Sequence, residues 1–161
     1  MENPKVSVII PNYNHELYLD ERIQSVLNQS YKDFEVIILD DVSKDNSRNV
    51  IEKYRSNPHV SHIVYNTENS GSTFKQWAKG FSLAKGELIW IAESDDSCSP
   101  ELLQKLVNEF EKDNELVLAY SLSMFIDEHG NQHKPANNVK RTVHLDGKDY
   151  IQRYMEFGNH I

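Results

Sequence analysis

The fold is decided by residues 6–41, VSVIIPNYNHELYLDERIQSVLNQSYKDFEVIILDD. Two runs inside this stretch, VSVII (6–10) and EVIIL (35–39), are almost continuous Val, Ile and Leu. Such runs are typical of strands that are buried on both faces of a parallel sheet. The apolar residues between them recur at helical spacing, and they are Leu19, Ile23, Val26 and Leu27. Strand, helix and strand in this order predict an α/β fold with a mostly parallel, Rossmann-like central sheet.

The same alternation continues along the rest of the chain. Further apolar runs cover residues 62–66, 87–92 and 116–126, and helical patterns lie within 45–56, 74–81 and 103–110. Ser99 and Pro100 fit the N-cap and first turn of the last of these helices. We therefore predict an α/β core over residues 1–126, flanked by helices. Residues 127–161 are predicted to hold a polar turn followed by a further helix around Tyr150.

Charge and composition exclude several classes of protein. The formal net charge of −8 argues against nucleic acid as a partner, because binding its backbone requires a surplus of Lys and Arg. No stretch approaches the roughly 18 apolar residues of a membrane span, and the N-terminus lacks the pattern of a secretory signal. Cys98 is the only cysteine, so an internal disulfide is excluded. We expect a cytoplasmic protein, compatible with peripheral attachment to the cytoplasmic face of a membrane.

Polar side chains follow the apolar runs at the points where the strands should end. These strand ends are Pro11–Asn14, Asp40–Asp41, Asn66–Asn69 and Glu93–Asp96. In an open parallel sheet, ligands bind at the carboxyl ends of the strands, so these groups are expected to converge on one edge. Neither of the usual glycine-rich phosphate loops is present, so a phosphate ligand must be neutralised by other local means.

The last strand end, within WIAESDDSCSP (90–100), carries three crowded carboxylates. Their mutual repulsion could be offset by water, a helix N-terminus, a basic side chain or a metal ion. Structural alternatives exist at each position: Asp40 or Asp41 could form a local turn, and Asp95–Asp96 could lie in a solvated loop. Tyr13 offers a flat face for stacking on a base, and Asn12 offers an amide for hydrogen bonds to a base edge.

These motifs, in this order and spacing from Val6 to Phe125, resemble the family 2 glycosyltransferases of GT-A fold. The stretches that carry the resemblance are residues 6–47, NSGS (69–72) and AKGELIWIAESDD (84–96). The resemblance implies a nucleotide-diphosphosugar donor, in our interpretation a UDP-sugar, and a divalent cation, Mn²⁺ or Mg²⁺. It also implies transfer of the sugar to a glycan or lipid-linked acceptor with inversion at the sugar carbon.

The resemblance assigns roles to particular residues as well. Pro11 and Tyr13 are similar to the residues that frame the nucleoside, and Asp41 to the aspartate that contacts the base or ribose, with Asp40 beside it. Asp95 and Asp96 fall on the family's DXD-type segment. There Asp96 is similar to the metal ligand, and Asp95 to the neighbour of the ribose or phosphate.

Two departures from the family pattern affect the expected chemistry. Trp77–Ala78 occupies the place of an Arg-Asn pair that such families often carry, so the family's usual basic contact to the donor from that helix is not expected from this pair. The general base is expected to lie beyond Ile161, as part of an acceptor-binding region. Three alternatives stay open: a nucleotidyltransferase, a signalling receiver domain with a metal-binding acidic pocket, and a module that binds the donor without catalysis.

Overall fold

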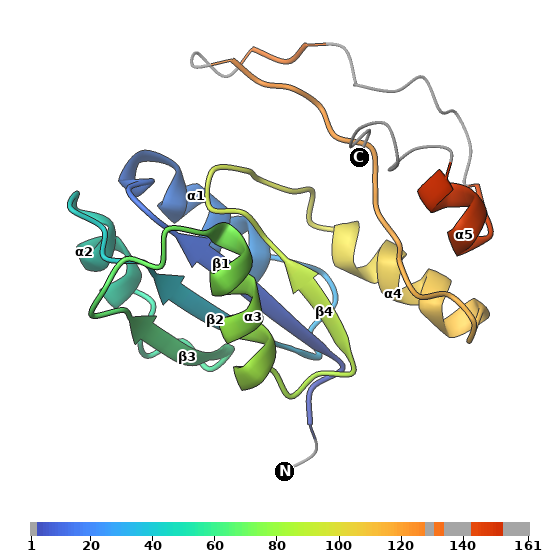
Figure 1. The fold of residues 1–161 in the computed structure, drawn as a ribbon, viewed down its shortest axis with the longest axis horizontal. Coiled ribbons are helices and arrows are strands. Elements are labelled where there is room, and N and C mark those ends of the chain that lie inside the picture. Colours follow the sequence, from blue (N-terminus) through green and yellow to red (C-terminus); the bar gives the residue numbers. More distant parts are fainter. Residues whose placement is uncertain (1–2, 128–130, 134–142, 153–161) are drawn as a thin grey trace. The chain divides into compact units, whose positions relative to one another are not determined.

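The computed structural model describes residues 3–127, 131–133 and 143–152, and the chain forms two compact units, Met1–Ala119 and Tyr120–Ile161. The first unit alternates strands and helices (Figure 1), as the sequence predicted. Its elements are β1 (Val6–Asn12), α1 (Glu16–Leu27), β2 (Phe34–Asp40), α2 (Ser47–Glu52), β3 (Val60–Tyr65), α3 (Thr73–Leu83), β4 (Leu88–Ile91) and α4 (Leu102–Lys112). The second unit contains the short helix α5 (Gly147–Tyr150). No helix in the described part of the chain is long and apolar enough to cross a membrane.

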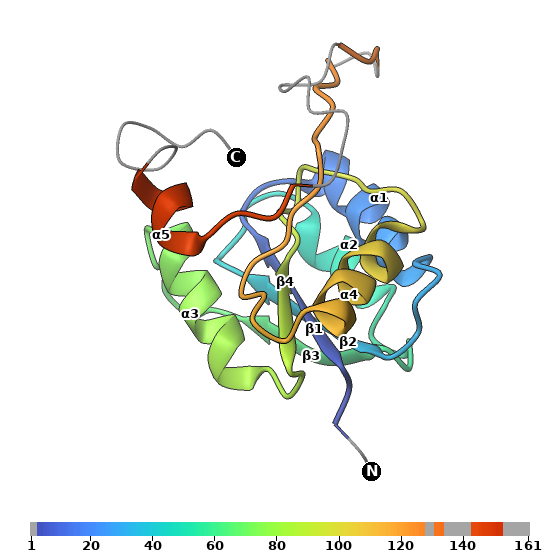
Figure 2. The ribbon, with the colours of Figure 1, turned by 90° about the vertical axis from the view of Figure 1, so that its right-hand side faces the viewer.

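The four strands form one parallel sheet in the order β3-β2-β1-β4. The central strand β1 pairs with β2 along its whole length, from Val6 opposite Phe34 to Asn12 opposite Asp40. Because all the strands run the same way, their carboxyl ends lie at the same edge. Figure 2 shows α1, α2 and α4 on one face of the sheet and α3 on the other. The α/β class with a parallel central sheet is therefore confirmed.

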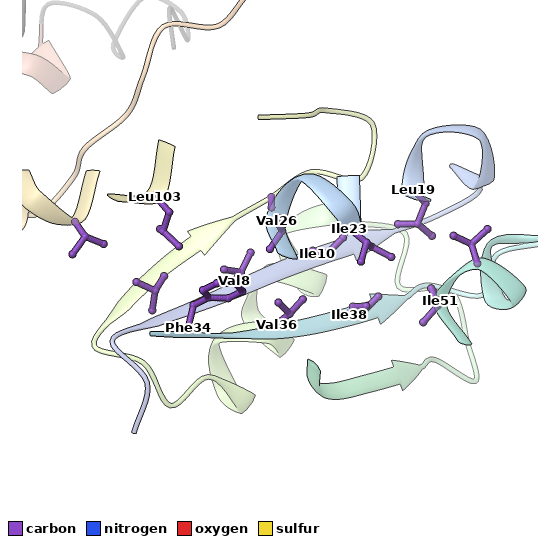
Figure 3. Close-up of a cluster of buried hydrophobic side chains, with 14 residues drawn as sticks. Val8, Ile10, Leu19, Ile23, Val26, Phe34, Val36, Ile38, Ile51 and Leu103 are labelled. Atoms are coloured by element: carbon purple, nitrogen blue, oxygen red, sulfur yellow. The ribbon is translucent and has the colours of Figure 1, made fainter. Parts of the chain in front are cut away.

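The hydrophobic core lies on both faces of β1 and β2. Alternate residues such as Val8 and Ile10 pack with α1, α2 and α4 in one cluster (Figure 3), while Ile9 and Ile37 belong to the cluster on the side of α3. All four side chains are fully buried. Full burial of one such side chain stabilises the fold by about 1.5–3 kcal/mol. This two-sided burial explains why the sequence of these strands is almost continuously apolar rather than alternating.

Helix α3 approaches the sheet closely at Gly80. A Cβ atom built at this position would lie 2.5 Å from Cγ2 of Ile9. Only a residue without a side chain permits this separation, so Gly80 sets the height of α3 above β1. The same close approach brings the N-terminal half of α3 near the strand ends, where Trp77 contacts the residues that follow β4.

Two sequence-based expectations about local structure were wrong. The apolar run 116–126 forms no strand, and Val117 and Phe125 are 86% and 60% exposed. Among the described residues it makes only an isolated antiparallel bridge between Ile126 and Gln132, so its backbone lacks the neighbour that a strand requires. Helix α4 begins at Leu102 without a side-chain cap rather than after Ser99. The expected helical residues after position 152 lie outside the described part of the chain.

Candidate functional site

The ends of β1 and β2 are joined by buried polar side chains. Nδ2 of Asn12 donates to Oδ1 of Asp40 (3.0 Å) and to Oγ of Ser43 (3.0 Å). Asp40 is fully buried, and its Oδ2 accepts from the backbone N–H of Ser43 and from Nε of Arg48. Pro11 is buried in β1 opposite Leu39. Asn12 and Asp40 thus hold the strand ends together, and their predicted contact with a donor stays a prediction.

The loops that follow β1 and β2 are joined by hydrogen bonds. Asn14 and Val42 both have left-handed backbone, with φ of 58° and 65°. This conformation is costly for a β-branched residue such as Val42, by about 1–3 kcal/mol. The loops are fixed by hydrogen bonds from Asn14 N to Ser43 Oγ (2.9 Å) and from Lys44 N to Asn14 Oδ1 (2.7 Å). Tyr13 lies between the fixed points with 43% of its surface exposed, so a face of its ring is accessible.

Asp41 anchors the loop that follows β3. Its Oδ1 accepts from Nδ2 of Asn66 (2.6 Å) and from the backbone N–H of Ser70 (2.9 Å), and its Oδ2 accepts from Oγ of Ser70 (2.7 Å). Burial acts to raise the pKa of Asp41, but the hydrogen bonds from Ser70 and Asn66 outweigh it and hold the pKa below its ordinary value. Asp41 is therefore a charged group that draws the ends of β2 and β3 together.

The acidic segment after β4 faces the loop that follows β1. Oγ of Ser94 lies 2.7 Å from Nδ1 of His15, immediately before α1. Asp95 and Asp96 are exposed to solvent, and the side chain of Asp96 is 70% accessible. Glu93 differs from both, because its Oε1 accepts from Nε1 of Trp77 on α3 (2.9 Å). Partial burial raises the pKa of Glu93 above its ordinary value, and the bond from Trp77 opposes that rise.

A basic side chain that sequence reasoning missed lies beneath this acidic segment. Arg22, from α1, is 97% buried, and its Nε donates to the backbone oxygen of Glu93 (2.6 Å). Its Nη2 lies 3.6 Å from Oδ2 of Asp96. Of the four ways to offset the repulsion of the carboxylates, the structure thus shows a basic side chain, next to carboxylates that are open to solvent. The only feature of the sequence that pointed to a buried Arg22 was its position next to the apolar residues of its helix.

The remaining oxygens suit a hard divalent cation that is shared with a ligand. No group of three or more His, Cys, Asp or Glu that could hold a metal occurs among the described residues. Mg²⁺ is commonly held by one or two carboxylates together with the phosphates of a substrate. The exposed carboxylates of Asp95 and Asp96 fit that mode, because their oxygens are accessible and are not all used by the protein.

A parallel α/β sheet with amide and carboxylate groups at its carboxyl edge defines an α/β protein with a candidate ligand site at that edge. Comparison with known proteins narrows this class. The sequence profile of glycosyl transferase family 2 matches residues 7–160. The chain therefore belongs to glycosyl transferase family 2, which decides against the receiver-domain and nucleotidyltransferase alternatives.

Two of the relatives are glycosyltransferases that are longer than this chain. The chain is 34% identical over 145 residues to an uncharacterised glycosyltransferase of Haemophilus influenzae, covering 90% of this chain and 57% of that protein. It is 37% identical over 102 residues to the putative teichuronic acid biosynthesis glycosyltransferase TuaG of Bacillus subtilis, covering 63% and 40% of the two chains. The chain thus spans about half the length of these relatives.

Solved structures share the same fold. The crystal structure of S. aureus TarS 1-349 in complex with UDP matches with a TM-score of 0.62 and 32% identity, over 67% of this chain and 32% of that one. The same protein has also been solved with UDP-GlcNAc. A mannosyltransferase from Pyrobaculum calidifontis matches at 23% identity with a TM-score of 0.60, over 68% and 33% of the two chains, and supports the fold alone. The GT-A fold predicted from the sequence is confirmed.

Proposed function

We propose that this chain is the donor-binding part of a glycosyltransferase that uses a UDP-sugar and a divalent cation, Mn²⁺ or Mg²⁺. In the complete reaction the sugar passes to a glycan or lipid-linked acceptor, with inversion at the sugar carbon. A lipid-linked acceptor would bring the protein to the cytoplasmic face of a membrane. The observation that carries the proposal is the meeting of exposed aromatic and carboxylate groups at one edge of the sheet, within a family 2 fold.

The ends of β1 and β2 suit the nucleoside. Tyr13 presents an exposed ring that can stack on a base. Asp41 lies at the neighbouring strand end and stays charged. Its oxygens already accept from Asn66 and Ser70, so the proposed contact with a base edge or a ribose hydroxyl would share these acceptors. Asn12 and Asp40 fix the two strand ends behind these groups. The match to TarS, whose structures hold UDP and UDP-GlcNAc, supports a uridine nucleotide.

The diphosphate would lie towards the segment after β4. Asp96 would hold the cation directly, and Asp95 would contact the ribose or a water bound to the metal. When bound, the cation stabilises negative charge on the leaving nucleoside diphosphate. Glu93 is tied to Trp77 and supports the segment from inside. This division of roles follows from exposure, because Asp95 and Asp96 face solvent while Glu93 is half-buried.

The proposal is tested by titration calorimetry of nucleoside diphosphates, with Mn²⁺ and with EDTA. UDP in Mn²⁺ should bind most tightly. Asp96→Asn, which keeps the shape and removes the charge, should abolish the dependence of UDP binding on Mn²⁺. Asp95→Asn should weaken binding less, and Glu93→Gln least. Full retention of the Mn²⁺ effect in Asp96→Asn would refute the assignment of the metal ligand, and absence of UDP binding by the wild type would refute the function.

A further inference from the structure

Arg22 is the buried cation closest to the proposed metal ligand. It lies on the face of α1 that packs on the sheet, where neighbouring positions of the helix, Leu19, Ile23 and Val26, are apolar and fully buried. A guanidinium in such a place costs desolvation unless charges and hydrogen bonds compensate it. Burial accordingly lowers the pKa of Arg22, and the nearby Cys98 and Asp96 oppose that shift.

The contacts of Arg22 all point to one loop. Its Nε donates to the backbone oxygen of Glu93 at 2.6 Å, which fixes the start of the acidic segment. Its Nη2 reaches Oδ2 of Asp96 at 3.6 Å, a distance that attracts the charge without an ideal hydrogen bond. Its Nη1 is buried and has no hydrogen-bond partner among the described residues. A buried donor without a partner is unfavourable, so this part of the guanidinium does not contribute to the stability of the fold.

We propose that Arg22 is a positioning residue of the donor site, which holds the acidic segment and serves as the counter-ion of Asp96 until a metal-bound diphosphate arrives. The inference rests on the proposed function, because it concerns the same site. Arg22 is buried and touches no donor atom; it acts through the placement and charge of Asp96. The pairing is loose at 3.6 Å, so Asp96 can exchange the guanidinium for a divalent cation without breaking a short ion pair.

Charge gives the inference a measurable consequence. A UDP molecule without metal brings a negatively charged diphosphate to a segment that carries three carboxylates, in a chain of net charge −8. In the wild type the charge of Arg22 offsets part of that repulsion. When Mn²⁺ is bound, the metal neutralises the same carboxylates, so Arg22 contributes less. Loss of the Arg22 charge should therefore weaken metal-free binding more than binding in Mn²⁺.

The test compares the dissociation constant of UDP in EDTA with that in Mn²⁺ for the wild type, Arg22→Met and Arg22→Lys. Methionine fills a similar volume and leaves no buried polar group unpaired, so we expect Arg22→Met to fold. The ratio of the two constants should rise about tenfold in Arg22→Met, the scale of one partly screened unit charge. In Arg22→Lys, which keeps the charge, the ratio should stay within about threefold of the wild type.

Lys5→Met is the matched control, because it removes one positive charge at the opposite end of β1, where Lys5 pairs with Glu87. Its ratio should equal that of the wild type. Equal weakening of both constants in Arg22→Met would show a merely structural role and would overturn the inference. If the wild type bound UDP only in Mn²⁺ and not in EDTA, the inference would also be overturned, since Arg22 would then not substitute for the cation. Failure of the wild type to bind UDP in either buffer would instead refute the proposed function.

Discussion

Replacement of Asp41 by Asn should destabilise the first unit strongly although it changes only one atom in the side chain. The buried carboxylate accepts from Asn66 Nδ2, from Ser70 N and from Ser70 Oγ, at 2.6–2.9 Å. Asparagine keeps only one acceptor oxygen, and its NH₂ group would face one of these hydrogen-bond donors. Hydrogen bonds to charged groups contribute about 1.5–3 kcal/mol each, and the losses are not additive. We therefore expect the free energy of unfolding to fall by about 2–4 kcal/mol at pH 7.

The pH dependence gives this prediction a second signature. The pKa of Asp41 is lowered in the folded state, so its charge stabilises the fold above the unfolded pKa of about 3.9. That contribution is lost as the pH falls through the lower, folded pKa. The difference between the wild type and Asp41→Asn should therefore be constant from about pH 5 to pH 8 and should shrink in more acidic buffers.

Urea unfolding at several pH values, followed by circular dichroism, measures both effects. Asp33→Asn is the control, because Asp33 is exposed and should change stability by less than about 0.5 kcal/mol. If Asp41→Asn changed the free energy of unfolding at pH 7 as little as this control does, the role given to the carboxylate would be wrong. It would also be wrong if the difference in stability from the wild type persisted unchanged at pH 3.

Three further changes address the stacking site, the close approach of α3 and the support of the acidic segment. Tyr13→Ala should weaken UDP binding by about 1–3 kcal/mol, the scale of a stacked ring, and unchanged calorimetry would remove this residue from the site. Gly80→Ala should lower stability by about 1–3 kcal/mol in urea unfolding, because its Cβ would lie 2.5 Å from Cγ2 of Ile9; a wild-type midpoint would disprove the overlap. Trp77→Phe should raise the pKa of Glu93 further, because the indole N–H stabilises the charged carboxylate, and NMR titration of the carboxyl carbon would reveal no shift if this bond is unimportant.

The fold was predictable where the sequence pattern reflects burial on both faces. VSVII and EVIIL indicate central strands because both faces of these strands are covered by helices. The polar residues within them, Ser7 and Glu35, are buried and hydrogen-bonded to each other. A strand was wrongly expected at residues 116–126, because this run is as apolar as the strands of the sheet. An apolar composition does not ensure that a neighbouring strand is present to pair with it. Pairing depends on residues far away in the chain, and among the described residues only Gln132 meets that run in a bridge.

The site was predictable as a set of strand ends but not as a network. Polar residues after apolar runs indicate which edge of a parallel sheet binds ligands. The contacts of Arg22 and Trp77 with Glu93 could not be predicted from the sequence, because both residues lie on helices. Arg22 is 71 positions from Glu93 in the sequence, and Trp77 is 16 positions from it. Nothing local distinguishes a buried arginine from one at the rim of a helix. The bonds of Asp41 to the loop after β3 depend in the same way on the order of strands in the sheet.

The central place of β1 also constrains how the protein can be made. Within the sheet this strand is synthesised before its two neighbours, β2 and β4, and β4 ends at Ile91. At about 5–20 residues per second, the synthesis of roughly 80 further residues takes about 4–16 s. During that time one edge of VSVII has no native neighbour to cover it, and such a segment is prone to aggregate. Yield in a heterologous host should therefore respond to the supply of chaperones that shield nascent apolar segments.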